Sequence, residues 1–371
     1  LLHATGYMQL YPEIWRGRLT MLFKSITDNL AAAFACREQS GLLQNTDALH
    51  MFHGPGESQL QNAALQAVLK NLSIDRFGQH AWVTLWEEQA NSAIHELFKK
   101  NLCAPLCDFL QQHFTSAVLL YRPLKGVPEN PSVLFGAPPS ERFSVHEGNT
   151  CEGLAKYWIQ LQDAKHPGLF LDHAPLRAWL MQNSKGLRVL NTFAYTGSLS
   201  VAAAISGASH VTTLDLSKAT MRWAEANGEL NGLNGDRARW IAGDVFEWLP
   251  RLKKETAQGK IPLFDMVIMD PPSFARSDKG AFSTAKDLPK LHELALDILA
   301  PGGLLITSIN SAQISWPQFE KDILQAAKQK NCTLQVLKRL EQPETFPNWL
   351  HEQADERYLK GFILRVCREN K

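Results

Sequence analysis

No apolar run in this 371-residue sequence is long enough for a membrane-spanning helix, and no signal peptide is visible. Internal repeats and low-complexity tracts are also missing. These absences argue against a helical membrane protein and against a fibrous or disordered chain. Hydrophobic residues make up 45% and charged residues 20%, so we expect a globular, cytoplasmic protein of more than one domain. The chain begins with Leu1 rather than Met, which leaves room for sequence ahead of it.

Cysteine pairs at zinc-binding spacing are missing too. Cys103 and Cys107 stand four residues apart in a helical-looking segment, but no second pair accompanies them. We therefore predict no metal site and reduced thiols. The formal net charge of +1 neither favours nor excludes a nucleic-acid partner, because a balanced total can hide a basic face. The six cysteines are Cys36, Cys103, Cys107, Cys151, Cys332 and Cys367.

The C-terminal half alternates strand and helix signals, with helix-length segments such as 217–232 and 285–300 between apolar runs. This alternation predicts a parallel sheet covered on both faces. Two last runs, 333–340 and 361–367, have no helical pattern between them, and we expect them to pair antiparallel at one side of the sheet. The other five of the seven predicted strands are 186–193, 210–216, 238–244, 264–270 and 302–310.

The N-terminal part predicts a smaller α+β domain. Helices are expected at 14–36 and 91–114, and a proline-rich connection or long hairpin loop at 123–141. We place the boundary near 163–172, which gives domains 1–165 and 166–371. The predicted strands of this part are 49–54, 72–77, 80–88, 117–123, 142–148 and 154–161.

The first strand–helix turn of the C-terminal domain reads "NTFAYTG" (191–197). Its single glycine, Gly197, is followed by small residues that open a helix, and the pattern is not GxGxxG. The turn therefore favours a ligand without a pyrophosphate over a dinucleotide. An ordinary strand–helix turn is the alternative.

Aspartates follow three successive strands of this domain: Asp215, Asp244 and Asp270. Each alone could be a helix N-cap. The carboxyl ends of parallel strands share one edge, where open α/β sheets bind ligands, and an acidic side chain there can accept both ribose hydroxyls. The three together predict a pocket for an adenosine-bearing ligand.

The loop "MDPPSF" (269–274) follows a buried-looking strand. Neither proline has an amide hydrogen, and each fixes φ, so the loop leaves the sheet as a stiff segment with free carbonyls. Such a loop suits a site that holds a substrate still, although Asp, Pro and Ser are also ordinary turn residues.

These motifs resemble, in order and spacing, those of class I S-adenosylmethionine-dependent methyltransferases, which implies a Rossmann-like seven-stranded sheet and S-adenosylmethionine as cofactor. "GLFLDHAPLRAWL" (168–180) looks like the entry segment of the bacterial 23S ribosomal RNA methyltransferase family, whose members make 5-methylcytidine or 7-methylguanosine. Residues 48–85 are similar to the small α+β domain of that family, while its N-terminal PUA module is not recognisable.

The resemblance implies roles for individual residues. Asp270, Pro271, Pro272 and Ser273 would lie where the methyl acceptor enters. Phe170, Asp172 and Arg177 would roof the pocket, unless they form a helix start packed on the domain seam. The implied cofactor contacts are Phe170, Asp172, Arg177, Asn191, Thr192, Phe193, Ala194, Tyr195, Gly197, Ser198, Asp215, Leu216, Ser217, Asn227, Asp244, Val245 and Asp270.

The acceptor implied by the resemblance is RNA, in particular large-subunit ribosomal RNA. The C5 enzymes of the family keep a catalytic cysteine in the loop after the fifth strand, where this chain has Asn310 and no sulfur. We therefore predict methylation of a nitrogen, guanine N7 ahead of an exocyclic amine. A methyltransferase acting on a small molecule or protein, and a binder that does not transfer the methyl group, are the alternatives. Monomer and homodimer both stay open.

Overall fold

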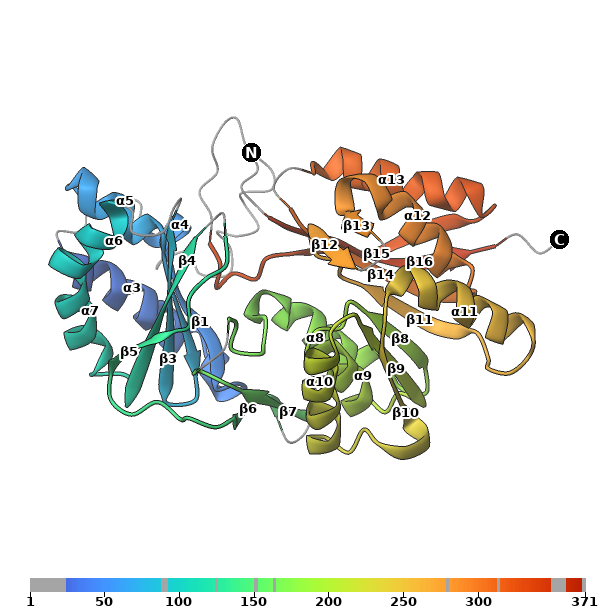
Figure 1. Ribbon diagram of the computed structural model, residues 1–371, viewed down its shortest axis with the longest axis horizontal. Helices are drawn as coiled ribbons and strands as arrows, with labels where there is room; N and C mark the ends of the chain where they lie inside the picture. Colours follow the sequence, from blue (N-terminus) through green and yellow to red (C-terminus); the bar gives the residue numbers. More distant parts are fainter. Residues whose placement is uncertain are drawn as a thin grey trace. The chain divides into compact units, whose positions relative to one another are not determined.

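The computed structural model describes residues 25–87, 93–123, 126–149, 153–162, 165–277, 280–311, 314–347 and 358–368, without the side chains of 149 and 274–285. The chain forms two compact units (Figure 1). The first comprises residues 1–143, 159–167 and 345–349, and the second comprises 144–158, 168–344 and 350–371. No helix among the described residues is long and apolar enough to cross a membrane.

The first unit is built on a five-stranded sheet in the order β1-β2-β3-β4-β5. Only β3 and β4 pair in parallel, because the helical stretch from Ala93 to Leu110 connects them. The helices pack on the sheet around Leu30, Leu69 and Leu106. The elements are α3 (Ile26–Gln39), β1 (Ala48–His53), α4 (Gly54–Glu57), α5 (Ala63–Lys70), β2 (Leu72–Phe77), β3 (His80–Glu87), α6 (Ala93–Leu97), a π-helical turn (Phe98–Leu102), α7 (Cys103–Leu110), β4 (Ser116–Pro123) and β5 (Ser132–Phe135).

The strands predicted in this unit occur within one or two residues of the expected positions. Of the two alternatives for the proline-rich stretch 123–141, the structure agrees with the hairpin, because β5 pairs antiparallel with β4. The sequence did not predict strand β5 itself. The predicted helix 91–114 is interrupted by the π-helical turn. Residues 14–24 of the first predicted helix lie outside the described residues.

The second unit contains the predicted seven-stranded sheet, in the order β10-β9-β8-β11-β14-β16-β15. The five strands from β10 to β14 are parallel, and β16 pairs antiparallel with both β14 and β15, as expected. The strands are β8 (Arg188–Thr192), β9 (His210–Asp215), β10 (Ala238–Ala242), β11 (Phe264–Met269), β14 (Leu299–Asn310), β15 (Thr333–Glu341) and β16 (Leu359–Cys367).

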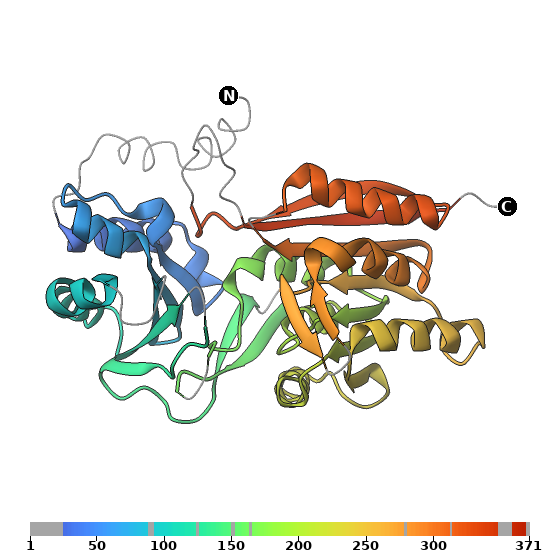
Figure 2. The ribbon, with the colours of Figure 1, turned by 45° about the horizontal axis from the view of Figure 1, so that its top comes forward.

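Helices cover both faces of this sheet. Successive strand residues face opposite sides, and the residues on both sides are apolar and buried. Met266 and Ile268 of β11 join one apolar cluster with α8 and α9, whereas Val267 and Met269 join another with α11, α12 and α13. The red helix α13 lies along the red strands β15 and β16 (Figure 2). The helices are α8 (Ala174–Asn183), α9 (Ser198–Ile205), α10 (Lys218–Leu230), α11 (Val245–Ala257), α12 (Thr284–Leu296) and α13 (Trp316–Gln329).

Two small hairpins complete the second unit. Strands β6 (Phe143–Asn149) and β7 (Gly153–Ile159) form one two-stranded sheet, where the sequence predicted two strands. Strands β12 (Phe274–Ser277) and β13 (Gly280–Ser283), which the sequence did not predict, form the other directly after the Asp-Pro-Pro loop. The strand order reverses between β8 and β11, and such a switch point is where open α/β sheets bind ligands.

A buried ion pair fastens the β6–β7 hairpin to α8. Arg177 is fully buried, and its Nε and Nη2 donate to the two carboxylate oxygens of Glu147 at 2.5 and 2.6 Å. Its Nη1 donates to the carbonyl oxygen of Phe170 at 2.7 Å. Since every charged atom of this pair has a partner, removing only one side chain would leave an unpaired charge in the interior.

We expect Glu147→Ala to lower the free energy of unfolding by about 3–5 kcal/mol, because Arg177 would stay buried without its carboxylate. Glu255→Ala is the matched control, since it breaks a pair with Arg239 whose side chains are 31% and 29% exposed. That change should cost less than about 1 kcal/mol. Urea denaturation of both variants measures the difference, and equal losses would contradict the assigned role of the Glu147–Arg177 pair.

Candidate active site

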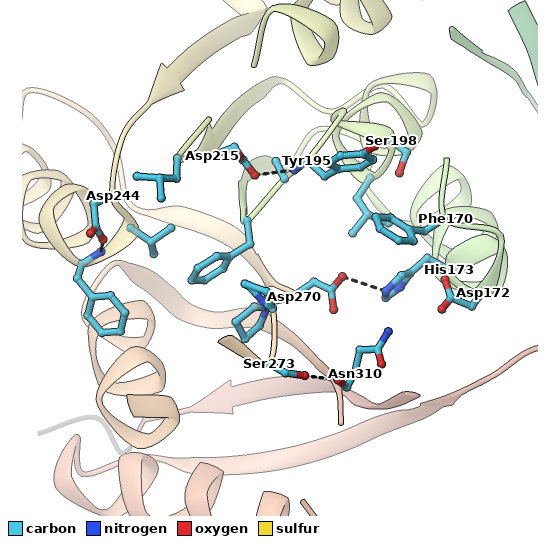
Figure 3. Close-up of a pocket in the computed structure, with 18 residues that line it drawn as sticks. Phe170, Asp172, His173, Tyr195, Ser198, Asp215, Asp244, Asp270, Ser273 and Asn310 are labelled. Atoms are coloured by element: carbon cyan, nitrogen blue, oxygen red, sulfur yellow. Dashed lines mark hydrogen bonds and ion pairs between the residues drawn. The ribbon is translucent and has the colours of Figure 1, made fainter. Parts of the chain in front are cut away.

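A cavity of about 540 Å³ opens at the carboxyl edge of the second unit's sheet (Figure 3). Its walls come from the ends of β8, β9, β10, β11 and β14 and from the segment before α8. The lining residues are Phe170, Asp172, His173, Phe193, Ala194, Tyr195, Ser198, Leu199, Asp215, Leu216, Asp244, Val245, Phe246, Asp270, Pro271, Pro272, Ser273 and Asn310.

The turn between β8 and α9 bends sharply around one side of this cavity. Phe193 and Tyr195 have φ values of 54° and 48°, in the left-handed region that side chains other than glycine rarely occupy. Gly197, with φ 74°, is the N-cap residue before α9, and a Cβ there would lie 3.0 Å from the Cβ of Ala224. Such strain persists only where the surroundings enforce it, and it is common at ligand sites.

Asp215, at the end of β9, has a fixed carboxylate. The backbone N–H of Tyr195 donates to its Oδ2 and the N–H of Ser217 to its Oδ1, both at 2.9 Å. Burial raises the pKa of Asp215, and the two hydrogen bonds oppose that change. Each carboxylate oxygen can accept more than one hydrogen bond, so the group can still accept from a ligand hydroxyl.

Asp244 is both a helix cap and part of the cavity wall. It is the N-cap of α11, and its side chain accepts a hydrogen bond from the N–H of Phe246 at 2.9 Å. The adjacent Val245 and Phe246 add apolar surface to the same wall. Asp244 therefore caps a helix and also lines the cavity.

Asp270 accepts hydrogen bonds on both carboxylate oxygens. Ser308 Oγ donates to Oδ1 at 2.6 Å, and His173 Nε2 lies 3.0 Å from Oδ2. Figure 3 shows the side chains of Asp270 and His173 pointing toward one another. Behind them, Ser273 Oγ donates to the carbonyl oxygen of Asn310, which ties the Asp-Pro-Pro loop to the end of β14.

A second carboxylate, Asp172, lies beside His173. Tyr358 donates its hydroxyl to Asp172 Oδ2 at 3.0 Å, while Oδ1 is buried with no hydrogen-bond partner among the described residues. Burial raises the pKa of Asp172. Burial alone would lower the pKa of His173, but Asp270 and Asp172 raise it above the usual value.

Burial by itself raises the pKa of Asp270. The charge of His173 and the hydrogen bonds from His173 and Ser308 outweigh this effect, so the pKa of Asp270 lies below its ordinary range. Asp270 is therefore ionised at neutral pH, and His173 keeps its proton to a higher pH than an ordinary imidazole does. An opposite charge within hydrogen-bond distance favours the charged form of each partner.

All four predicted acceptor-side residues and eleven of the predicted cofactor contacts line the cavity. The other six predicted cofactor contacts do not line the cavity, and each has a structural role instead. Arg177 pairs with Glu147, Asn191 donates to Ser200, and Thr192 donates to the carbonyl of Ile268. Gly197 is the N-cap residue of α9, Ser217 is the N-cap residue of α10, and Asn227 forms hydrogen bonds with both Trp158 and Thr196.

The sequence did not predict that His173 and Leu199 line the cavity. His173 lies in the quoted segment "GLFLDHAPLRAWL", between the predicted Asp172 and Arg177, but no spacing rule distinguishes it there. No group of His, Cys, Asp or Glu among the described residues could hold a metal ion.

Comparisons with known proteins place this geometry in a family. Residues 119–359 match the family described as S-adenosylmethionine-dependent methyltransferase. A ribosomal RNA large subunit methyltransferase K/L from Chromohalobacter salexigens is 42% identical over 172 residues, which are 46% of this chain and 22% of that protein. A ribosomal RNA large subunit methyltransferase I from Aliivibrio fischeri is 30% identical over 301 residues, 80% of this chain and 72% of that protein.

A solved structure agrees over more of the chain. The methyltransferase SMU.776, crystallised with S-adenosylhomocysteine (SAH), is 28% identical and matches with a TM-score of 0.76 over 92% of this chain and 80% of its own. The chain spans about a fifth of the K/L relative's length, so the relatives' names describe larger proteins. By sequence and by fold, this chain belongs to the S-adenosylmethionine-dependent methyltransferase family.

Proposed function

We propose that this chain transfers a methyl group from S-adenosylmethionine to a nitrogen of a nucleobase in 23S ribosomal RNA, guanine N7 ahead of an exocyclic amine. The observation that carries the proposal is the cavity that joins the strand-end aspartates and the Asp270–Ser273 loop in a chain of this family. When bound, the cofactor supplies a methyl group activated on a sulfonium.

The cavity fits this cofactor at two independent points. Asp215 presents a fixed carboxylate for ribose hydroxyls, beside the apolar surface of Val245 and Phe246 that suits a flat base. Asp172 Oδ1, buried and without a hydrogen-bond partner among the described residues, suits the ammonium group of a methionine. Asp244 would contact the adenine edge.

At the acceptor end, the chain supplies positioning. The prolines after Asp270 stiffen the loop, and the hydrogen bond from Ser273 to the Asn310 carbonyl fixes its far side. A methyl transfer in line with the leaving sulfur gains most from alignment and from exclusion of water. Asp270, Ser273 and Asn310 would hold a flipped-out base in that alignment.

A cysteine-assisted C5 mechanism finds no support at this site. None of the cysteines described by the structure lines the cavity, and Cys151 lies outside the described residues. The sheet register pairs Asn310 with Leu359, and Cys367, which pairs with Thr333, is eight residues further along β16. At about 3.3 Å per residue, Cys367 and the neighbouring Cys332 are about 26 Å from the cavity edge.

The protonation states favour an acceptor that needs no base. Asp270 has a pKa below its ordinary range. It is therefore a weak proton acceptor at neutral pH. A ring nitrogen such as guanine N7 attacks with a free lone pair and loses no proton, whereas an exocyclic amine must release one.

RNA is supported by the names of the relatives and by a feature of the first unit. Arg122 lies over the ring of Trp86, with 5.3 Å between guanidinium carbon and ring centroid, and Trp86 is 39% exposed. An exposed aromatic ring beside a cation can stack on an unpaired base. We propose that the first unit contributes to RNA recognition.

One alternative function is a methyltransferase that acts on a small molecule or a protein. The other is a protein that binds the cofactor without transferring its methyl group and is therefore not an enzyme. Binding of S-adenosylhomocysteine (SAH) and the destination of the transferred methyl group distinguish these three functions.

We expect one molecule of SAH to bind per chain, and Asp215→Ala to weaken binding about tenfold or more. The loss of buried hydrogen bonds to the ribose would cost about 1–3 kcal/mol. Isothermal titration calorimetry measures both. Asp236→Ala, at an exposed residue outside the cavity, should bind SAH as the unaltered protein does. No binding at millimolar SAH would end the methyltransferase assignment.

With tritiated cofactor, we expect label in ribosomal RNA rather than in protein or small molecules, and 7-methylguanosine as the labelled nucleoside. The substrates to compare are unmodified ribosomal RNA, assembled subunits and protein extract, followed by digestion and mass spectrometry. Cys332→Ser and Cys367→Ser should retain activity, because neither thiol lies at the cavity. Label only outside the RNA would refute the RNA acceptor, and 5-methylcytidine would refute the nitrogen acceptor.

A further inference from the structure

His173 is the one titratable residue lining the cavity that neither the sequence motifs nor the proposed function assigns. It ends the short 3-10 turn Leu171–His173, directly before α8. Its side chain is 10% exposed, and that of Asp270 is 25% exposed. The imidazole is therefore nearly enclosed, while the carboxylate it contacts remains open to the cavity.

Two donors from different parts of the fold determine how Asp270 lies. Ser308 belongs to β14, the neighbouring strand of the sheet, and donates to Oδ1 at 2.6 Å. His173 belongs to the segment before α8 and contacts Oδ2 at 3.0 Å. A carboxylate with one donor can rotate about its Cβ–Cγ bond, whereas donors on both oxygens fix its plane.

We propose that His173 is a positioning residue, whose imidazole holds the Asp270 carboxylate in one orientation at the methyl-acceptor end of the cavity. This role rests on the proposed function. In it, Asp270 faces the base, and His173 acts on the reaction only through Asp270.

The charges around this pair explain why an imidazole is suited to the position. Asp172 and Asp270 place two carboxylates next to His173, Tyr358 donates to Asp172, and Arg177 lies near but is neutralised by Glu147. A protonated imidazole lowers the repulsion between the two carboxylates. A neutral side chain here would leave the negative charge of Asp270 without an opposite charge beside it.

The chemistry makes the charge of Asp270 matter. A neutral ring nitrogen that accepts a methyl group becomes positively charged, and a fixed carboxylate beside it stabilises that charge. Burial by itself raises the pKa of Asp270, and His173 contributes the largest opposing effect. Without His173 the carboxylate would take up a proton at a higher pH and lose this ability.

The test compares His173→Leu with His173→Gln, which keeps an N–H donor but no charge. We expect His173→Leu to lower kcat about tenfold to a hundredfold. The Kd for SAH and the KM for RNA should each change less than about threefold, because His173 acts on the chemical step. His173→Gln should recover part of the lost kcat.

The pH profile separates this role from a structural one. The acidic limb of kcat should move to higher pH in His173→Leu, since Asp270 then protonates more easily, and it should lie in between for His173→Gln. His210→Gln, at the start of β9 and outside the cavity, should leave kcat and the profile unchanged. An unshifted limb in His173→Leu, or an equal loss of kcat in both variants, would overturn the role.

An NMR titration of the protein without substrate gives an independent readout. The pKa of His173 should fall in Asp270→Asn, because the largest raising effect is removed. An unchanged pKa would show that the two groups do not interact and would overturn the inference. Absence of methyl transfer by the unaltered protein would refute the proposed function and this role with it. If His173→Leu were as active as the unaltered protein, only the positioning role of His173 would be refuted.

Discussion

The parallel register of β11 between β8 and β14 is the constraint on which the site depends. Met269 lies opposite Thr192 on one side and Thr307 on the other. The next residues along the three strands are Phe193, Asp270 and Ser308, which therefore reach the same edge at the same level. A slip of one residue would turn Asp270 to the other face of the sheet and away from Ser308. Buried apolar side chains on both faces of β11 make such a slip costly.

Much of this arrangement could be predicted from the sequence because its signals are local. Apolar runs identified the seven strands, and the lack of a helical pattern between 333–340 and 361–367 identified the antiparallel pair. The position of an aspartate directly after a strand also predicts where its side chain lies, since parallel strands end at one edge. Asp215, Asp244 and Asp270 accordingly line one cavity.

The features that the sequence did not predict are long-range or lie in weakly patterned segments. Strand β5 is only four residues long and follows several prolines, which conceal its pairing with β4. The pair Glu147–Arg177 joins residues 30 positions apart, and the contact of His173 with Asp270 spans almost a hundred positions. In neither pair does the spacing along the chain indicate the partner, because the two residues are brought together only by the fold.

The three aspartates that line the cavity are held by independent sets of hydrogen bonds. Asp215 and Asp244 accept hydrogen bonds from backbone N–H groups, whereas Asp270 is fixed by side chains of β14 and of the segment before α8. Loss of a donor to Asp270 therefore leaves the other two aspartates in place. The proposed nitrogen acceptor rests on the same contacts, because they leave Asp270 charged and because no described cysteine lines the cavity.

A crystal structure of this chain with SAH tests the central claim most directly. We expect ribose hydroxyls within hydrogen-bond distance of Asp215, the adenine ring against Val245 and Phe246, and the sulfur facing the space in front of Asp270. SAH bound elsewhere on the chain, or with its sulfur directed away from Asp270, would contradict the assignment of the cavity as the methyl-transfer site.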